Sequence, residues 1–572
     1  MKGNSIWHDG ANLLELLWLQ GKPASLLFLC WSWKNAGYSG SWRVNFHELR
    51  IRAAKSTRDQ ASVPANVRFC DDHCCVKQSQ RIVKNAIFGI GGSAVGGLIY
   101  LATVLKIARS VSVTEFGKYS FVLAFAMFVS NVADSGLPRM LTRAVARDRE
   151  ELLPVAGATF SLIWILSGAV CLLVCIVAPF LHFGTDVKIA MVGMSLATLA
   201  AFHGSGYGAI LRAYEDNELV QTGFVLHKLS LFVFVYLALK LNLTLFGFVA
   251  AHLITNILLW AFYEVLVSHM YARISLRFDI GLWKKLLLDA LPLGGSVMLR
   301  QLALQMDVLV LTWLSNLTVV GLFSGPYRIS TALRIVPQAL STPLFPLFSR
   351  TAHSSKERFT EVYQLSVKFF LIVSIPIAAF FVSWSGPILR TALGRKYLPA
   401  IPAMQLLGIG LVPFFLSTLF QYLFAALGEQ KRFFVSTCTT SILRLVLLVT
   451  LIPTLGLIGP PIAFLCSEVL VVGIWVLQLH RLGFSSRFLH ISWRPLVSGA
   501  IMCVLLFTCS ETTPPTQRGA IAIVAMLLYG GLLFVLRAFT PEEISHVREG
   551  ISFIAPFVQT WSKRLTRARK ID

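Results

Sequence analysis

The sequence predicts an all-α polytopic membrane protein with about fourteen transmembrane helices, arranged as two six-helix lobes and a final helix pair. Two observations predict this fold class. Hydrophobic residues make up 55% of the 572 residues, charged residues make up only 14%, and the mean hydropathy is +0.68, as in polytopic membrane proteins. The apolar residues also gather in runs long enough to cross a hydrocarbon core of about 30 Å, which needs roughly 20 residues.

The predicted helices fall into three groups. An N-lobe over residues 81–270 would contain spans near 86–107, 117–135, 155–181, 187–208, 221–240 and 244–267. A C-lobe over residues 271–482 would contain spans near 290–314, 319–347, 363–384, 400–427, 433–452 and 457–479. Residues 483–540 would add the last pair, near 495–510 and 519–538.

A short internal similarity supports the division into two lobes. At an offset of about 203 residues, Gly91-Gly92-Ser93 corresponds to Gly294-Gly295-Ser296, and Phe116–Ser120 corresponds to Val320–Ser324. An even number of predicted helices separates the copies, so both would have the same orientation in the membrane. We therefore expect parallel repeats that handle cargo at their interface.

The two ends of the chain differ from the apolar middle. Residues 1–80 are rich in Trp, Ser, Arg and Lys, and we expect a poorly ordered or mis-annotated extension there. Cys70-Asp-Asp-His73-Cys74-Cys75 offers metal ligands but has no second separated pair, so no metal site is predicted. Residues 541–572 follow a capping box and combine helically spaced apolar residues with a basic end, which predicts an amphipathic cytoplasmic helix lying on membrane lipids, with a solvated tail as the alternative.

The net charge of +23 predicts topology and not nucleic-acid binding, because Lys and Arg lie in short loops and in the tails and form no basic domain. Alternate loops, beginning with the one that contains Arg139, Arg143, Arg147 and Arg149, carry the excess. The positive-inside rule then places both termini in the cytoplasm.

Four charged residues lie inside the helical hairpin that turns at Leu317. They are Arg300, Asp307, Arg328 and Arg334. Residues equally far from the turn lie at similar depth, so Asp307 and Arg328 would share one layer, and Arg300 and Arg334 a deeper one. Charge at this depth is costly and marks a path for polar cargo. The alternative is a structural ion pair between Asp307 and Arg328.

Other polar residues complete the candidate site. Asn131 and Asp134 fall near the level of Arg334 and would form the opposite wall. Arg444 and Glu468 lie at comparable depth around a turn near Thr454 and are predicted to pair, mainly as a structural feature. No Walker loop, nucleophile elbow or HExxH motif occurs in the sequence, so we expect a transporter without a cofactor and not an enzyme.

Several short motifs, in this order, resemble the polysaccharide-transporter branch of the multidrug, oligosaccharidyl-lipid and polysaccharide (MOP) exporter superfamily, which includes O-antigen flippases. The resemblance covers residues 82–540. It rests on Ala108-Arg109 with Glu115–Tyr119, Asp134–Pro138 with Arg143, Ile210–Tyr214, Asp307 with Gly321 and Tyr327-Arg328, Ala425–Lys431, and Pro453–Gly459. Pro460-Pro461 and the N-terminal extension depart from the family pattern.

The resemblance implies two six-helix lobes around a central cavity and alternating access. It also implies export of an undecaprenyl-pyrophosphate-linked oligosaccharide across the bacterial inner membrane, together with partner glycosyltransferases and a polysaccharide polymerase. A drug or metabolite antiporter of the same superfamily and a non-transporting scaffold are the alternatives. Arginine outnumbers aspartate in the hairpin, and arginine binds phosphate with two hydrogen bonds, so the flippase is favoured.

Overall fold

A computed structural model describes residues 72–134, 136–352, 355–484, 488–507 and 515–538. The chain divides into two compact units, Met1–Lys77 and Gln78–Asp572, and nearly all described helices lie in the second. The extension predicted over residues 1–80 lies mostly outside the described residues, and the predicted basic tail lies wholly outside them. The described residues form helices and no strands, which confirms the predicted all-α fold class.

The helices of the first half are α4 (Asp72–Ser110), α5 (Val113–Asp134), α6 (Leu137–Arg147), α7 (Leu152–Val177), α8 (Thr185–Ala213), α9 (Asn217–Lys240) and α10 (Leu245–Met270). Those of the second half are α11 (Ile280–Leu314), α12 (Leu317–Ala332), α13 (Ile335–Ala352), α14 (Lys356–Ser383), α15 (Ser385–Ala392), α16 (Ile401–Ala426), α17 (Gln430–Leu455) and α18 (Gly459–Arg481). The last pair is α19 (Phe488–Phe507) and α20 (Pro515–Val535). Short 3-10 helices cover Ala178–Phe180, Arg395–Ala400 and Gly456–Ile458.

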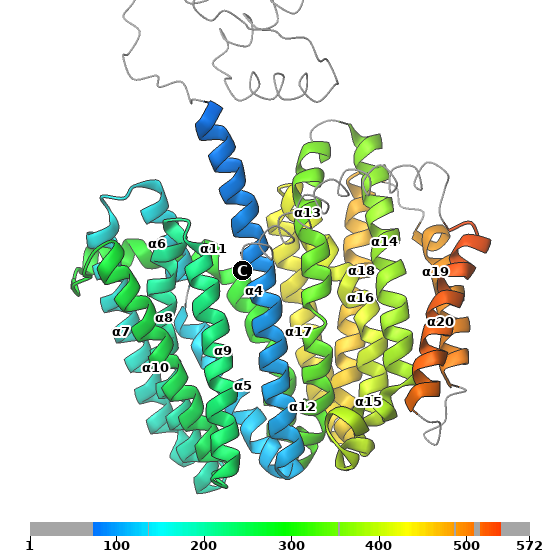
Figure 1. Cartoon of the computed structure of the whole chain (residues 1–572), viewed down its shortest axis with the longest axis horizontal. Coiled ribbons are helices and arrows are strands. Elements are labelled where there is room, and N and C mark those ends of the chain that lie inside the picture. Colours follow the sequence, from blue (N-terminus) through cyan, green and yellow to red (C-terminus); the bar gives the residue numbers. More distant parts are fainter. Residues whose placement is uncertain (1–71, 135, 353–354, 485–487, 508–514, 539–572) are drawn as a thin grey trace, which may run out of the picture. The chain divides into compact units, whose positions relative to one another are not determined.

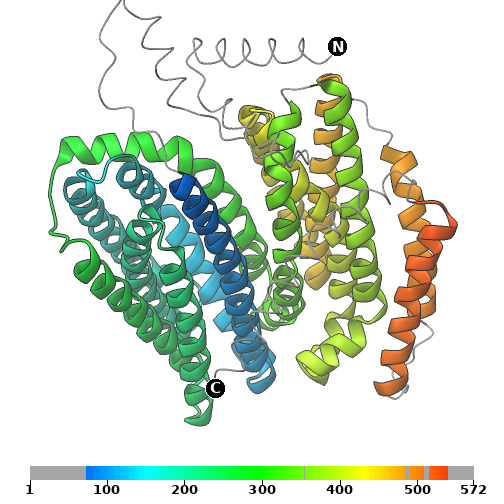
Figure 2. The same cartoon turned by 45° about the horizontal axis from the view of Figure 1, so that its top comes forward.

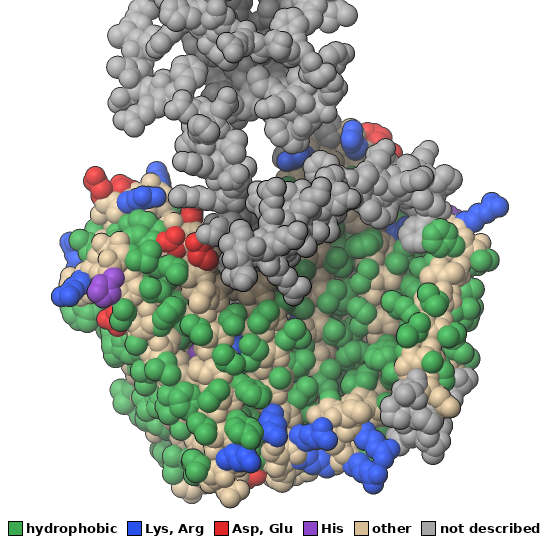
Figure 3. All heavy atoms as spheres, in the orientation of Figure 1, with side chains coloured by type: hydrophobic (Ala, Val, Ile, Leu, Met, Phe, Trp, Pro, Cys, Tyr) green, Lys and Arg blue, Asp and Glu red, His purple; other side chains and the backbone are tan. Residues whose placement is uncertain are grey.

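Helices α5–α10 form one group and α13–α18 a second, with α19 and α20 beyond the second group (Figures 1 and 2). Ten segments of the described chain are long and apolar enough to cross a membrane, and the protein is a multi-pass membrane protein. Broad areas of hydrophobic side chains cover the face seen in Figure 3, and Lys and Arg gather at its lower edge. The total of fourteen spans stays a prediction.

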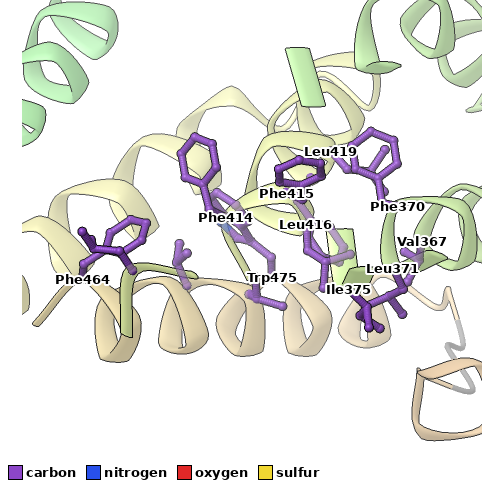
Figure 4. Packing of buried hydrophobic residues seen from close by; sticks show 14 of the residues in the cluster. Val367, Phe370, Leu371, Ile375, Phe414, Phe415, Leu416, Leu419, Phe464 and Trp475 are labelled. Atoms are coloured by element: carbon purple, nitrogen blue, oxygen red, sulfur yellow. The ribbon is translucent and has the colours of Figure 1, made fainter. Parts of the chain in front are cut away.

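Each half has its own apolar core. Leu141, Phe160 and Ile210 belong to a buried cluster of the first half. In the second half, aromatic and aliphatic side chains of α14, α16 and α18, among them Phe370, Phe415 and Trp475, pack together (Figure 4). A third cluster contains residues of both halves, because Leu393 and Tyr397 pack with the residues of α5, α8 and α10.

The span predicted near 319–347 is not one continuous helix. It is interrupted at Leu333 and Arg334, where the Arg334 N–H donates to the Thr331 carbonyl at 3.2 Å. Pro337 has no N–H to donate to the Leu333 carbonyl, and that carbonyl instead accepts from the Val336 N–H at 3.1 Å. The consequence is that Arg334 lies at a helix break, a feature that membrane proteins tolerate where backbone lies inside protein or beside a cavity.

Candidate functional site

A buried ion pair joins α11 to α17. Arg444 donates from Nε to Asp307 Oδ1 at 3.0 Å and from Nη2 to Asp307 Oδ2, so both carboxylate oxygens accept from one guanidinium. The two side chains are 6% and 1% exposed. The Arg444 guanidinium also lies 5.0 Å from the centre of the Phe464 ring. A paired and hydrogen-bonded charge can remain buried, so this pair fixes α17 against α11.

The ion pair between Asp307 and Arg328, which was the alternative interpretation of these charges, is therefore wrong. Counting residues from the hairpin turn predicted their depth, but depth leaves open which way each side chain points. Arg328 lies instead close enough to Tyr119 and His252, both in the first half of the chain, to act on them electrostatically. Tyr119 Oη and His252 Nε2 are hydrogen-bonded at 3.1 Å.

Arg334, at the break between α12 and α13, lies among aromatic rings. Its guanidinium is 4.9 Å from the centre of the Phe414 ring and 5.8 Å from that of Tyr327. It is close enough to Asp307 to act on that carboxylate, but Asp307 has already paired with Arg444. Among the described residues no carboxylate is within ion-pair distance of Arg328 or Arg334. Both arginines therefore have charge available for an anion.

A cavity of about 80 Å³ opens beside the ion pair. Its walls come from α11, α16, α17 and α18, and its lining residues are Ala303, Leu304, Phe414, Ser417, Phe433, Thr437, Thr440, Ser441, Arg444, Ser467, Glu468, Val471 and Trp475. The volume admits several water molecules but is smaller than the roughly 300–1,000 Å³ of typical ligand pockets. We interpret it as a hydrated chamber behind the ion pair.

Glu468 lines this cavity together with Arg444, which agrees with their predicted comparable depth. Glu468 is close enough to Arg444 to act on it electrostatically, but the guanidinium of Arg444 forms its ion pair with Asp307. No ion pair between Glu468 and Arg444 is present in the described part of the chain, so the direct pairing predicted for them is not observed. Glu468 adds a half-buried carboxylate to the lining of the cavity.

Three predicted site residues cannot be placed by their side chains. Arg300 belongs to α11, and Asn131 and Asp134 belong to α5, but these side chains lie outside the described part of the structure. Their proposed contribution to the site stays a prediction.

A polar cluster in the first half was missed by the sequence reasoning. Lys228 and His227 lie in the middle of α9, and His227 Nε2 is 2.9 Å from Asn256 Oδ1 on α10. The Lys228 ammonium lies 4.8 Å from the centre of the Tyr100 ring and 5.3 Å from that of Phe224. The sequence did contain a sign of this cluster, because Lys228 lies inside the predicted span 221–240, and a lysine inside a membrane span is as unusual as an arginine inside the hairpin.

The first turns of α5 and α12 touch each other in a reciprocal way. A Cβ built on Gly117 would lie 1.8 Å from the Leu317 carbonyl oxygen, and one built on Gly321 would lie 2.0 Å from that of Val113. Between them the Thr114 and Thr318 hydroxyls are hydrogen-bonded at 2.8 Å, and these two residues are 204 positions apart. The same separation relates Val113 to Leu317 and Gly117 to Gly321, so a local two-fold relation joins the two repeats here.

Side chains around this contact add hydrogen bonds between the halves. Arg109 Nη1 donates to the Thr391 carbonyl at 3.0 Å. Lys396 Nζ donates to the Arg109 carbonyl at 3.1 Å and also to that of Val111. The two halves are thus held together at the end where α5 and α12 begin.

Comparisons with known proteins agree with this architecture. Residues 82–352 match the family described as "Polysaccharide biosynthesis protein". A protein of Shigella flexneri named "Putative O-antigen transporter" is 22% identical over 406 residues, which cover 67% of this chain and 94% of that protein. These matches confirm the resemblance to polysaccharide transporters that the sequence motifs predicted.

Solved structures share the fold. The lipid II flippase MurJ in an inward closed conformation superimposes with a TM-score of 0.67 at 15% identity, over 79% of this chain and 99% of that chain. A MATE multidrug transporter of the MOP superfamily, in an inward-facing conformation, gives a TM-score of 0.54 at 14% identity, over 73% and 96% of the two chains. The relatives are named as transporters and flippases and not as enzymes.

Proposed function

We propose that this protein is a flippase that moves a lipid-linked oligosaccharide across the bacterial inner membrane for the assembly of a surface polysaccharide. One observation carries the proposal. Within the spans, Arg334 lies over two aromatic rings, and neither Arg328 nor Arg334 has an ion-pair partner among the described carboxylates, in a chain whose relatives are named for polysaccharide biosynthesis and O-antigen transport. Charge kept at such depth marks a path for a polar cargo of opposite sign.

We further propose that the cargo is linked through undecaprenyl pyrophosphate. A diphosphate that crosses a membrane must lose much of its water, and arginine replaces that water with charge-assisted hydrogen bonds in a geometry that suits phosphate. Lysine would supply the charge but not the planar pair of donors. Arg334 would bind the diphosphate, with Arg300, Asn131 and Asp134 as additional wall residues. Glycosyltransferases would supply this cargo, and a polymerase would use it after transfer.

The proposed transport cycle uses the contact between α5 and α12. The lobes would separate at this end to release cargo and close again around the Gly117 and Gly321 contact. A backbone contact made through glycines leaves no side chain between the helices, so α5 and α12 can approach each other closely in the closed state and still separate. With both termini in the cytoplasm, this end would face the periplasm.

A drug or metabolite antiporter is the second candidate, because a MATE transporter shares the fold. An exporter of organic cations would need a free carboxylate in its cavity. Asp307 is bound through both oxygens by Arg444, and the cavity carboxylate of Glu468 lies close enough to the Arg444 guanidinium to act on it, which favours the anionic cargo instead. A non-transporting scaffold would have no need of unpaired arginines inside the membrane.

The test is export in a strain whose own flippase gene for the same surface polysaccharide is deleted. We expect the wild-type chain to restore surface polysaccharide, and Arg334→Ala to lower it about tenfold or more, since hydrogen bonds to charged groups contribute about 1.5–3 kcal/mol. Arg334→Lys should rescue partly and Arg334→Glu should abolish export. Arg300→Ala and Arg300→Glu should behave in the same way.

Amounts are normalised to protein in the membrane, and Arg395→Ala serves as the matched control because Arg395 is exposed in the short helix Arg395–Ala400. Wild-type export from the Arg300→Glu, Arg334→Glu double variant would refute a role of these arginines in cargo binding. Failure of the wild-type chain to restore any lipid-linked glycan export would refute the flippase.

A further inference from the structure

The connection between α10 and α11, together with the first turns of α11, exposes large apolar side chains outside the ten candidate membrane spans. Phe278 is 68% exposed and Ile280 is 79% exposed, and Leu276 and Leu288 are exposed as well. We call residues 273–288 the linker segment, and it lies at the outer edge of the first helix group (Figures 1 and 2). An exposed apolar patch of this kind indicates a surface that binds a partner or a membrane.

Backbone and side-chain contacts hold the linker segment against α7. The Arg277 N–H donates to the Gly157 carbonyl at 3.1 Å, and the Ser161 hydroxyl donates to the Arg277 carbonyl at 2.5 Å. Trp283 Nε1 donates to the same hydroxyl oxygen at 3.1 Å. A Cβ built on Gly157 would lie 2.5 Å from the Ser275 carbonyl oxygen, so a side chain there would push the segment away. The linker segment therefore has a fixed place along α7.

The contact with α7 also gives the depth of the linker segment. The candidate span Leu152–Phe180 has 29 residues, or about 44 Å at the usual rise, which matches the roughly 40–45 Å of a bilayer with its headgroups. Gly157 is five residues from the start of this span, or about 8 Å along the helix. Because the hydrocarbon core is about 30 Å thick, a centred span has about 7 Å in each headgroup layer. The linker segment therefore lies where headgroups and acyl chains meet.

Basic side chains accompany the apolar ones. Four basic and two acidic residues lie between positions 273 and 289. Asp279 is used within the segment, because its carboxylate accepts from the Leu282 N–H at 3.0 Å and lies 3.5 Å from Arg277 Nη2. Lys284 and Lys285 are exposed in the following turn and have no ion pair among the described residues. Cations beside exposed apolar side chains are typical of segments that bind anionic membrane surfaces.

We propose that the linker segment is a docking surface for the headgroup of an anionic phospholipid. Phe278 and Ile280 enter the acyl-chain region, and Lys284 and Lys285 bind the phosphate of the headgroup. The Trp283 ring packs edge-to-face with Phe278 at 6.0 Å between ring centres, and tryptophan is common at the boundary between lipid and water. The predicted topology puts the segment at the cytoplasmic leaflet, whose negative surface potential attracts basic segments.

The position of this surface has a consequence for the whole protein. The linker segment connects α10 to α11, and α11 carries Asp307 of the buried ion pair. Because the segment is also hydrogen-bonded to α7, a phospholipid bound to it fixes the depth of these three helices in the bilayer. This surface acts on the bilayer and does not depend on the cargo.

The test uses the full chain in nanodiscs with an added cysteine, Ile280→Cys, labelled with bimane, a fluorophore that brominated lipids quench. Phosphatidylglycerol or phosphatidylcholine, each brominated on its acyl chains, is added at increasing mole fraction, and the signal of the labelled parent chain is subtracted. We expect both lipids to quench the fluorophore. Phosphatidylglycerol should do so at an about tenfold lower mole fraction, since each basic residue near the membrane surface contributes about a fivefold preference.

The Lys284→Gln, Lys285→Gln change should lower this preference at least fivefold. The Lys356→Gln, Arg358→Gln change is the matched control, because it also removes two exposed cations from the first turns of a helix, in this case α14, and it should leave the preference unchanged. If the double lysine variant does not accumulate in the membrane, 0.5 M salt decides in its place. Screening of exposed charges should then remove the preference in the wild-type chain.

Three results would overturn the proposal. Equal quenching by the two brominated lipids would show that the segment lies in the membrane without selecting a headgroup. The absence of quenching by either lipid would assign the apolar patch to a protein partner. A preference for phosphatidylglycerol that survives both the double lysine change and 0.5 M salt would show that Lys284 and Lys285 do not bind the headgroup.

Discussion

The α5–α12 contact gives the most direct test of the transport cycle. Gly321 is the residue to change, because a Cβ there would lie 2.0 Å from the Val113 carbonyl oxygen, whereas ordinary contacts begin near 3.4 Å. Gly321→Ala therefore requires the two helices to move apart by about 1.4 Å, the difference between those distances. Overpacking of this kind costs about 1–3 kcal/mol. If the cost falls only on the closed state, the population shifts roughly 5- to 150-fold toward the state that is open at this end.

Cysteine cross-linking measures this shift. Thr114 and Thr318 have hydroxyls 2.8 Å apart, so cysteines at the two positions can form a disulfide when this end is closed. We expect rapid oxidation of the Thr114→Cys, Thr318→Cys variant, detected as the linked peptide by mass spectrometry. Adding Gly321→Ala should slow cross-linking at least fivefold, and Gly117→Ala should do the same. The cross-linked protein should not transport until it is reduced.

Gly97→Ala is the matched control. Gly97 lies in α4, and a Cβ at this position would meet nothing within 4 Å, so the same substitution creates no overlap there. Cross-linking in the Gly97→Ala background should equal that of the parent. A Gly321→Ala protein that cross-links as fast as the parent would refute the view that this backbone contact closes the molecule at this end.

Three further predictions follow from the buried pair, the charged loops and the surface ion pair. Asp307→Asn should leave Arg444 buried without a counter-charge and lower the stability of the protein by about 3–5 kcal/mol, measured as a lower Tm or a smaller amount of protein in the membrane. The Asp307→Asn, Arg444→Gln double variant should recover much of the lost stability. An Asp307→Asn protein as stable as the wild type would contradict a required ion pair. Reporters fused after Arg149 should lie in the cytoplasm and those after Asp186 on the opposite side, and reversal of both would refute the predicted topology. Lys118→Ala should lower stability by no more than about 1 kcal/mol, because its partners are partly exposed, and a larger loss of Tm would show that this ion pair is a structural requirement.

Much of the architecture could be predicted from local sequence. Helical class and membrane location depend on the apolar content of short windows, so hydropathy alone predicted them. The repeat signal near Phe116 and Val320 was short, yet these residues lie in the region where α5 and α12 meet with two-fold symmetry. The break at Arg334 falls inside the single span predicted near 319–347, although Pro337 indicates an interruption there, because an apolar run can continue through a change of backbone direction.

The partners of the charged residues depended on tertiary structure. A helix rises by a constant amount per residue, so counting from a turn predicts how deep Asp307, Arg328 and Lys228 lie. The neighbours at that depth depend on how helices far apart in the sequence pack and rotate, and 137 residues separate Asp307 from its partner Arg444. The sequence by itself therefore determined the helical class and the membrane location, and it predicted the depth of the charges. Packing decided that Asp307 pairs with Arg444 and that Arg328 and Arg334 have no ion-pair partner among the described residues, because those contacts join helices that no local pattern relates.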